Sequence, residues 1–131
     1  MTAEIVNRRN ADPDHDVVTV HGGEGMMRRP CPECPWRRTN AGGFPAEAFR
    51  LSAPTAYDMA THTFGCHQSG TERPRTCAGA AVRTGHSLAL RMRGAEAAEV
   101  EDVGDDLFDD YREMAEANGV DPDDPVLRSC R

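Results

Sequence analysis

The sequence predicts a small, mainly α domain of the α+β class that is stabilised by a metal ion, with a Cys-x-x-Cys knuckle and short helices around a treble-clef or zinc-ribbon-like core. Three observations lead to this prediction. Four of the five cysteines recur in a pattern typical of metal ligands. Only 5% of the 131 residues are aromatic, which leaves little material for a large apolar core. The stretches with helical periodicity are short.

The first 27 residues are predicted to form a flexible N-terminal arm. They are mostly polar, and the Val-rich run at 16–21 is at most one short strand, which Gly22-Gly23 would end. We expect a basic metal-binding core over 28–93. An acidic, helical C-terminal segment is expected over 94–131.

Residues 31–34 read Cys-Pro-Glu-Cys and predict a tight turn with both thiolates pointing inward. Such a pair chelates an ion from one turn, and two more ligands from about 30 residues away complete a tetrahedron. Cys66 and Cys77 follow, although the gap after Cys34 is longer than in most zinc fingers and ten residues separate Cys66 from Cys77. We therefore predict one metal centre at Cys31, Cys34, Cys77 and one of Cys66 or His67. The alternative is that the thiols only pack a core.

Cys66 and His67 compete for the fourth ligand position because adjacent side chains of an extended segment point in opposite directions. Thiolate affinity for zinc or iron favours Cys66. His67 would then lie beside the metal or at the surface. His62 and His86 are isolated in the pattern, and we interpret both as surface or core residues.

Several helices are expected after the knuckle. Pro45 is predicted at the first position of a helix over 45–51, and 52–59 adds a further turn or two. A short extended piece follows at 64–67. Thr76 is a candidate N-cap for a helix over 78–93, although Gly79 and Gly85 weaken its propensity.

The last helix has the clearest periodicity. Its apolar positions recur at three- and four-residue steps, from Leu107 to Ala115, and Asn118-Gly119 supplies a stop. Asp105-Asp106 would favour its N-terminal end. An Asp-capped turn is expected over 121–128.

The identity of the metal stays open between Zn²⁺ and a [4Fe-4S] cluster, since four thiolates suit either. The Cys-Pro-x-Cys turn and a cysteine at a helix start favour zinc. The uneven ligand spacing, and shielding by Trp36 and Phe64, keep the cluster as the alternative.

Charge is distributed unevenly along the chain. The net charge is −3 over 1–27, +6 over 28–93 and −10 over 94–131, which sums to −7. Six arginines lie near the proposed ligands in sequence and are candidates for nucleic-acid contact: Arg28, Arg29, Arg37, Arg38, Arg73 and Arg75. The alternative is a solvated basic surface that the acidic segment balances.

Three motifs together resemble an uncharacterised family of small proteins from actinobacteria and their phages. They are Arg-Pro-Cys-Pro-x-Cys-Pro-Trp-Arg at 29–37, Phe-Gly-Cys-His at 64–67 and Cys-Ala-Gly at 77–79. The resemblance covers about residues 29–93. It implies a metal-type cysteine set at Cys31, Cys34, Cys66 and Cys77 with His67 beside it, and it implies no activity.

Two binding functions fit this composition. In the first, the metal is structural and the protein is a regulatory or host-interaction module whose basic core contacts nucleic acid or a nucleic-acid enzyme. In the second, the thiolates hold an iron–sulfur cluster that senses redox state.

An enzyme is the less favoured class. The string His21-Gly-Gly-Glu24 is one residue too long, and too near Cys31, for the zinc-deaminase pattern. Four protein ligands also leave no open position for a reacting water. The enzymatic hypothesis that remains is an open metal site with three cysteine ligands, in which His67 acts as a base.

The expected compartment is the cytoplasm, or the host cytoplasm for a phage-encoded protein. No segment has the ~20 apolar residues that span a bilayer, and the N-terminus has no apolar signal stretch. In a reducing compartment, five cysteines favour metal binding over disulfides. A protein or nucleic-acid partner is expected, and the oligomeric state stays open.

Overall fold

The computed structural model describes residues 4–13, 15–21, 26–66, 75–93, 100 and 106–130. The strands are β1 (Glu4–Asp12), β2 (His15–His21) and β3 (Thr63–Phe64). The α-helices are α1 (Ala46–Ser52), α2 (Ala78–Arg83), α3 (Leu88–Arg91) and α5 (Tyr111–Ala117). Three 3-10 turns are η1 (Arg38–Asn40), η2 (Ala53–Ala56) and η4 (Pro125–Leu127).

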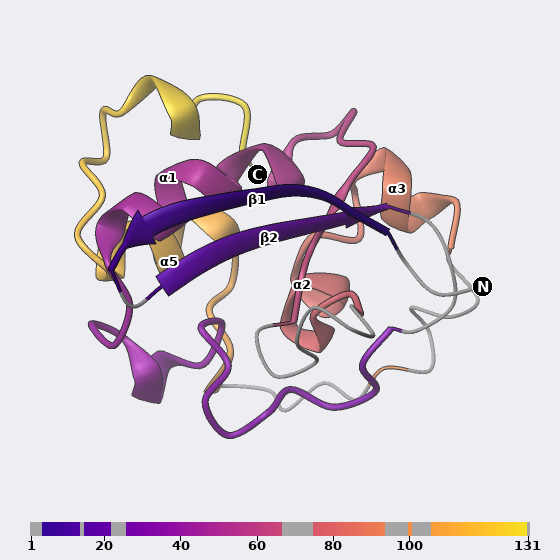
Figure 1. Cartoon of the computed structure of the whole chain (residues 1–131), viewed down its shortest axis with the longest axis horizontal. Coiled ribbons are helices and arrows are strands. Elements are labelled where there is room, and N and C mark those ends of the chain that lie inside the picture. Colours follow the sequence, from indigo (N-terminus) through magenta and orange to yellow (C-terminus); the bar gives the residue numbers. More distant parts are fainter. Residues whose placement is uncertain are drawn as a thin grey trace.

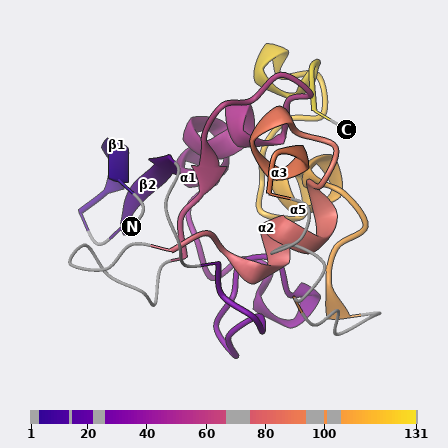
Figure 2. The same cartoon turned by 90° about the vertical axis from the view of Figure 1, so that its right-hand side faces the viewer.

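The protein is a small α+β domain in which a three-stranded antiparallel sheet, ordered β1-β2-β3, lies beside short helices. The β1–β2 hairpin lies on one side of the molecule, and α2, α3 and α5 lie on the other (Figures 1 and 2). Among the described residues, no helix is long and apolar enough to cross a membrane.

The N-terminal segment differs from the expected arm with at most one strand. The strand at 16–21 is present as β2, but residues 4–12 form a second strand that pairs with it along its length. After Ile5 and Val6, β1 has no further β-branched residue, and it lacks the alternation of apolar and polar residues by which a strand is recognised. The hydrogen bonds to β2 therefore stabilise an extended conformation that the residues of β1 do not favour by themselves.

The core is centred on Trp36, whose side chain is fully buried. Its ring makes edge-to-face contacts with Tyr111 at 5.8 Å and with Phe64 at 6.5 Å between centroids. Tyr111 is fully buried and donates its hydroxyl hydrogen to the carbonyl of Phe49 at 2.7 Å. These contacts join the segment after the knuckle to α1 and α5, so a few aromatic residues connect most of the chain.

The first predicted helix is present, with shifted bounds. α1 begins at Ala46, and Pro45 is its extended N-cap residue instead of its first helical residue. The further turn expected after it is the 3-10 turn η2.

The predicted helix over 78–93 is wrong as a single element. It is two short helices, α2 and α3, separated by a turn at 84–87. The hydroxyl of Thr84 donates to the carbonyl of Ala80 at 2.7 Å, Gly85 follows, and Ser87 then caps α3 by accepting from Leu90 N. These side chains offer the backbone an alternative to a continuous helix. Cys77, not Thr76, is the N-cap of α2.

The last predicted helix is α5, which begins at Tyr111, later than the apolar pattern suggested. Asp110 is its N-cap, and its carboxylate accepts from the N–H of Glu113 at 2.9 Å. The acid that caps this end is therefore Asp110, while Asp106 pairs with Arg37 and Asp105 lies outside the described residues. Gly119 has φ +98°, so the expected stop is confirmed.

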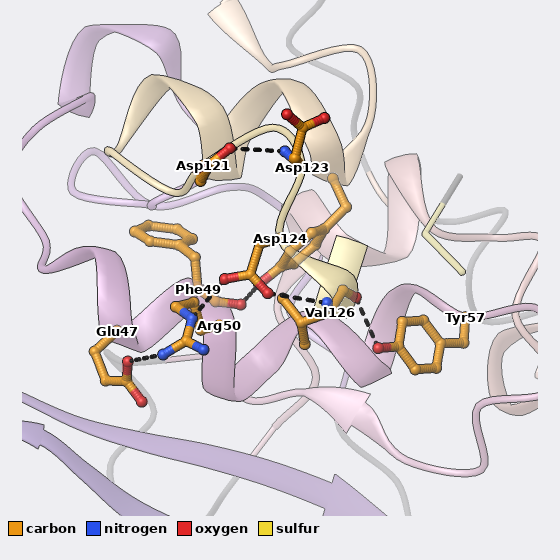
Figure 3. Close-up of polar contacts among 9 residues, drawn as sticks. Glu47, Phe49, Arg50, Tyr57, Asp121, Asp123, Asp124 and Val126 are labelled. Carbon is orange, nitrogen blue, oxygen red and sulfur yellow. Dashed lines mark hydrogen bonds and ion pairs between the residues drawn. The ribbon is translucent and has the colours of Figure 1, made fainter. Parts of the chain in front are cut away.

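The acidic C-terminal segment docks on the rest of the domain. Asp124 accepts from Arg50 Nε at 2.7 Å, and Arg50 also pairs with Glu47 on α1 (Figure 3). Tyr57 donates its hydroxyl hydrogen to the carbonyl of Val126 at 2.7 Å. The turn over 121–126 is thereby held against α1 and η2.

Candidate metal centre

The knuckle at 31–34 has the predicted turn geometry. The N–H of Cys34 donates to the carbonyl of Cys31 at 3.1 Å, and the N–H of Arg37 donates to the carbonyl of Cys34 at 3.0 Å. Asn40 adds side-chain hydrogen bonds to the carbonyls of Pro32 and Cys34, both at 2.9 Å. The turn is therefore fixed by its own backbone and by the residues that follow it.

Cys66 and Cys77 are brought together by backbone pairing. The N–H of Cys66 donates to Arg75 O at 2.8 Å, and the N–H of Cys77 donates to Phe64 O at 2.8 Å. Gly65 and Thr76 form the antiparallel bridge between these two bonds. The ten-residue gap that weakened the motif in sequence is thus closed by a short ladder.

The same ladder receives the chain that leads into the knuckle. Met26 forms a parallel bridge with Thr76, and the N–H of Met27 donates to Thr76 O at 2.9 Å. Thr76 is fully buried, and its hydroxyl lies 2.8 Å from that of Thr63. Three separated segments therefore meet at Thr76, and the cysteines lie next to this junction.

The Sγ atoms of Cys34 and Cys77 are 3.7 Å apart and buried. The pKa of Cys34 is lowered, first by the hydrogen bond from Cys77 and, against the effect of burial, also by the backbone N–H groups of Trp36 and Gly79. The pKa of Cys77 is raised well above its usual value, first by the same hydrogen bond and then by burial. Because Cys34 receives the additional N–H donors, we take it as the acceptor of the pair.

Cys31 and Cys66 lie close enough to this pair to interact electrostatically. Burial raises the pKa of the Cys31 thiol to about 11, and the charges of Cys34 and Cys66 add to the rise. The charge of Cys66 also raises the pKa of the Cys77 thiol. In the described part of the chain, no group of three or more His, Cys, Asp or Glu side chains has a geometry that holds a metal ion. The four thiols are neighbours, and a shared ion would require Cys31 and Cys66 to approach the Cys34–Cys77 pair.

Two predicted site residues, His67 and Arg73, lie outside the described residues. Cys130, which the motif leaves out, is buried on another side of the core, with its Sγ 3.6 Å from the carbonyl of Ala53. Burial raises the pKa of this thiol to about 11. His62 is exposed.

Residues 26–131 match a family of unknown function, DUF6283. The chain belongs to this family. All four proposed ligands lie inside the matched segment of DUF6283, whereas the β1–β2 hairpin lies outside it. No curated protein and no solved structure matched the chain.

Within the DUF6283 segment, two of the candidate nucleic-acid arginines contact the acidic C-terminal segment. Arg37 pairs with Asp106 at 2.8 Å and is 18% exposed. Arg38 pairs with Asp109 at 3.4 Å and with Glu113, and its guanidinium lies over the Phe108 ring at 5.3 Å from the centroid. The pKa of the Asp106 carboxyl is lowered, chiefly by its hydrogen bond from Arg37. Both arginines are therefore paired with acids of the C-terminal segment, and their contact with phosphate stays a prediction.

Three other candidate arginines of the DUF6283 segment are exposed: Arg28, Arg29 and Arg75. Arg28 follows Met27 and Arg75 precedes Thr76, so the Met27–Thr76 hydrogen bond places their segments side by side. In the part of the chain that the structure describes, these three arginines are thus exposed on segments next to the cysteines.

An Asp–His pair in the DUF6283 segment was not found from the sequence. His86 Nδ1 lies 2.9 Å from Asp58 Oδ1, while His86 Nε2 is buried and without a hydrogen-bond partner among the described residues. The two residues are 28 positions apart, and no motif joins them. Because Nε2 does not reach solvent, we assign this pair a structural role.

A cavity of about 360 Å³ opens between the hairpin and the α1–η2 segment. Its lining includes Arg9, Leu51, Tyr57 and His62 and no cysteine. The cavity therefore shares no lining residue with the four thiols.

Proposed function

We propose that the protein is a metal-stabilised interaction module in which Cys31, Cys34, Cys66 and Cys77 bind one structural Zn²⁺ ion. The observation that carries this proposal is the convergence of four thiols from three separated segments, with Cys34 and Cys77 already 3.7 Å apart. Two sulfurs that share one tetrahedral zinc ion at 2.3 Å each lie about 3.8 Å from one another. The distance therefore supports a single ion.

A [4Fe-4S] cluster is the alternative that this distance disfavours. Each cysteine of such a cluster binds a different iron, so the sulfurs lie farther apart than two ligands of one ion. Trp36 contacts Phe64 edge to face and lies in the same buried cluster as Cys34, Cys66 and Cys77, which suits either centre.

The arrangement of backbone around the thiols supports the treble-clef-like form of the proposal. That form combines a knuckle, a short ladder and a helix that begins at a ligand. Here the knuckle is 31–34, the ladder joins 64–66 to 75–77, and Cys77 is the N-cap of α2.

Metal content tests this proposal directly. The full chain, purified without oxygen, should contain one zinc per molecule and be colourless, and Co²⁺ should give the absorption of a four-thiolate tetrahedral site. A brown protein with stoichiometric iron and sulfide would show the cluster instead. Protein that binds neither zinc nor iron under these conditions would refute a metal centre.

We further propose that the surface formed by Arg28, Arg29 and Arg75 contacts nucleic acid. Three exposed guanidinium groups on adjacent segments suit phosphate, and the metal would fix those segments relative to each other. We also propose a regulatory or host-interaction role in the bacterial cytoplasm for this module.

Salt dependence tests the nucleic-acid contact. Binding to a fluorescent oligonucleotide should weaken linearly on a log–log plot against salt concentration, and the Arg28→Ala/Arg29→Ala variant should reduce the slope by about 2. Arg38→Ala is the matched control, because Arg38 pairs with Asp109 and Glu113 and should leave the slope unchanged. Wild-type protein that does not bind at low salt would exclude this part of the proposal.

A further inference from the structure

Arg37 makes an unusual set of contacts around the knuckle. Its Nε donates to the carbonyl of Cys31 at 2.8 Å, its Nη2 donates to the carbonyl of Pro30 at 3.0 Å, and its Nη1 donates to Asp106 Oδ2 at 2.8 Å. All three guanidinium nitrogens thus have partners. Two of these partners are the backbone carbonyls at and just before the first cysteine.

Hydrogen bonds to the carbonyl of Cys31 close the knuckle turn. It accepts both from Arg37 Nε and from the backbone N–H of Cys34, while the backbone N–H of Arg37 donates to the carbonyl of Cys34. Arg37 therefore holds the turn at both of its cysteines. Cys31 is also the least buried of the four proposed ligands, so it depends most on its backbone for orientation.

Asp106 is placed for this contact by backbone pairing. The N–H of Phe108 donates to Trp36 O at 3.0 Å, and Arg37 forms an antiparallel bridge with Leu107. The acidic segment is thereby aligned along the chain that follows the knuckle. Asp106 fixes the guanidinium, and the guanidinium fixes the two carbonyls.

We propose that Arg37 and Asp106 are positioning residues for the metal centre, so that the acidic C-terminal segment controls metal affinity through one guanidinium. The inference rests on the proposed metal-binding function. Groups that orient metal ligands from outside the coordination sphere typically contribute 10–100-fold to affinity. The loss of either residue should release the knuckle at Cys31 and leave the Cys34–Cys77 pair in place.

The test compares zinc affinities of full-length variants by chelator competition. Arg37→Ala and Asp106→Ala should each bind zinc 10–100-fold more weakly than the wild type. Arg38→Ala is the matched control: Arg38 is the next residue and pairs with Asp109 and Glu113 of the same segment. Its affinity should stay within about threefold of the wild type, as expected for a surface ion pair.

Arg37→Lys separates positioning from charge. A lysine keeps the positive charge opposite Asp106, but its single ammonium group cannot replace a planar fork that reaches three acceptors. The affinity should therefore remain low in this variant. The Co²⁺ spectrum should also change from a four-thiolate to a three-thiolate site as Cys31 leaves, which a general loss of stability would not produce.

The outcomes separate the inference from the proposed function. Wild-type protein without metal affinity would refute both. Tight zinc binding by the wild type, with equal affinity in Arg37→Ala or an equal loss in Arg38→Ala, would overturn the inference alone. If Arg37→Ala fails to fold, Asp106→Ala decides the question, because Asp106 lies at the edge of the network.

Discussion

The Cys77→Ser variant should not accumulate as folded protein. Cys77 is the N-cap of α2, is buried, and contacts Cys34 at 3.7 Å, so it connects the knuckle, the ladder and the helix. Under the proposed function it also supplies a zinc ligand, and structural zinc contributes on the order of 10 kcal/mol to folding. That loss exceeds the total stability of most small domains.

Circular dichroism and zinc content of this variant should be compared with those of Cys130→Ala. The control removes a second buried thiol, one that contacts the carbonyl of Ala53 and takes no part in the cluster. The burial of Cys130 predicts a loss of about 1 kcal/mol with unchanged zinc content. A Cys77→Ser protein that is folded and stable would contradict the proposed centre.

Gly79→Ala should destabilise the fold by about 3 kcal/mol or more, although an alanine normally favours a helix. A Cβ atom at this position would lie 2.6 Å from the Cβ and 2.8 Å from the Cγ of Trp36. Trp36 is fully buried between Phe64 and Tyr111, so it has no space to yield. Either α2 or the indole must move, and both lie beside the thiols.

Urea denaturation measures this loss, and Gly85→Ala is the matched control. Among the described residues, positive φ is confined to Gly42 and Gly119, and the nearest atom to a Cβ at Gly85 is 3.8 Å away. The same substitution should therefore change stability there by about 0.5 kcal/mol or less. Equal stabilities for the two variants would show that α2 does not pack on Trp36 as closely as described.

The local part of the fold could be predicted from the sequence because its signals are local. The turn at 31–34, the start of α1 and the stop at Gly119 each depend on a few adjacent residues, and the structure has all three. The position of Cys77 at a helix start was predicted to within one residue.

The parts that were missed depend on contacts between distant residues. β1 forms because β2 offers it a hydrogen-bonding edge. The sequence of residues 4–12 does not by itself predict this pairing. The break between α2 and α3 follows from side-chain bonds at Thr84 and Ser87 that compete with the helix. Propensity alone does not resolve such competition.

The sequence grouped four cysteines, and the structure places Cys34 and Cys77 in contact, while metal binding by the four stays a prediction. The contact of Arg37 with Asp106 was missed because the two residues lie 69 positions apart. An arginine beside a cysteine motif is equally consistent with phosphate binding and with bracing a loop. Only the positions of the carbonyls of Pro30 and Cys31 distinguish these roles.

The pairing of 64–66 with 75–77 has a consequence for how the motif tolerates insertions and deletions. Because hydrogen bonds hold Cys66 and Cys77 at the ends of two paired arms, flexible residues inserted between the arms would add only a loop-closure entropy. Doubling the length of that connection would cost about 0.6 kcal/mol. If the four cysteines bind one ion as proposed, the length of this interval should vary among relatives, while the two-residue gap between Cys31 and Cys34 stays fixed.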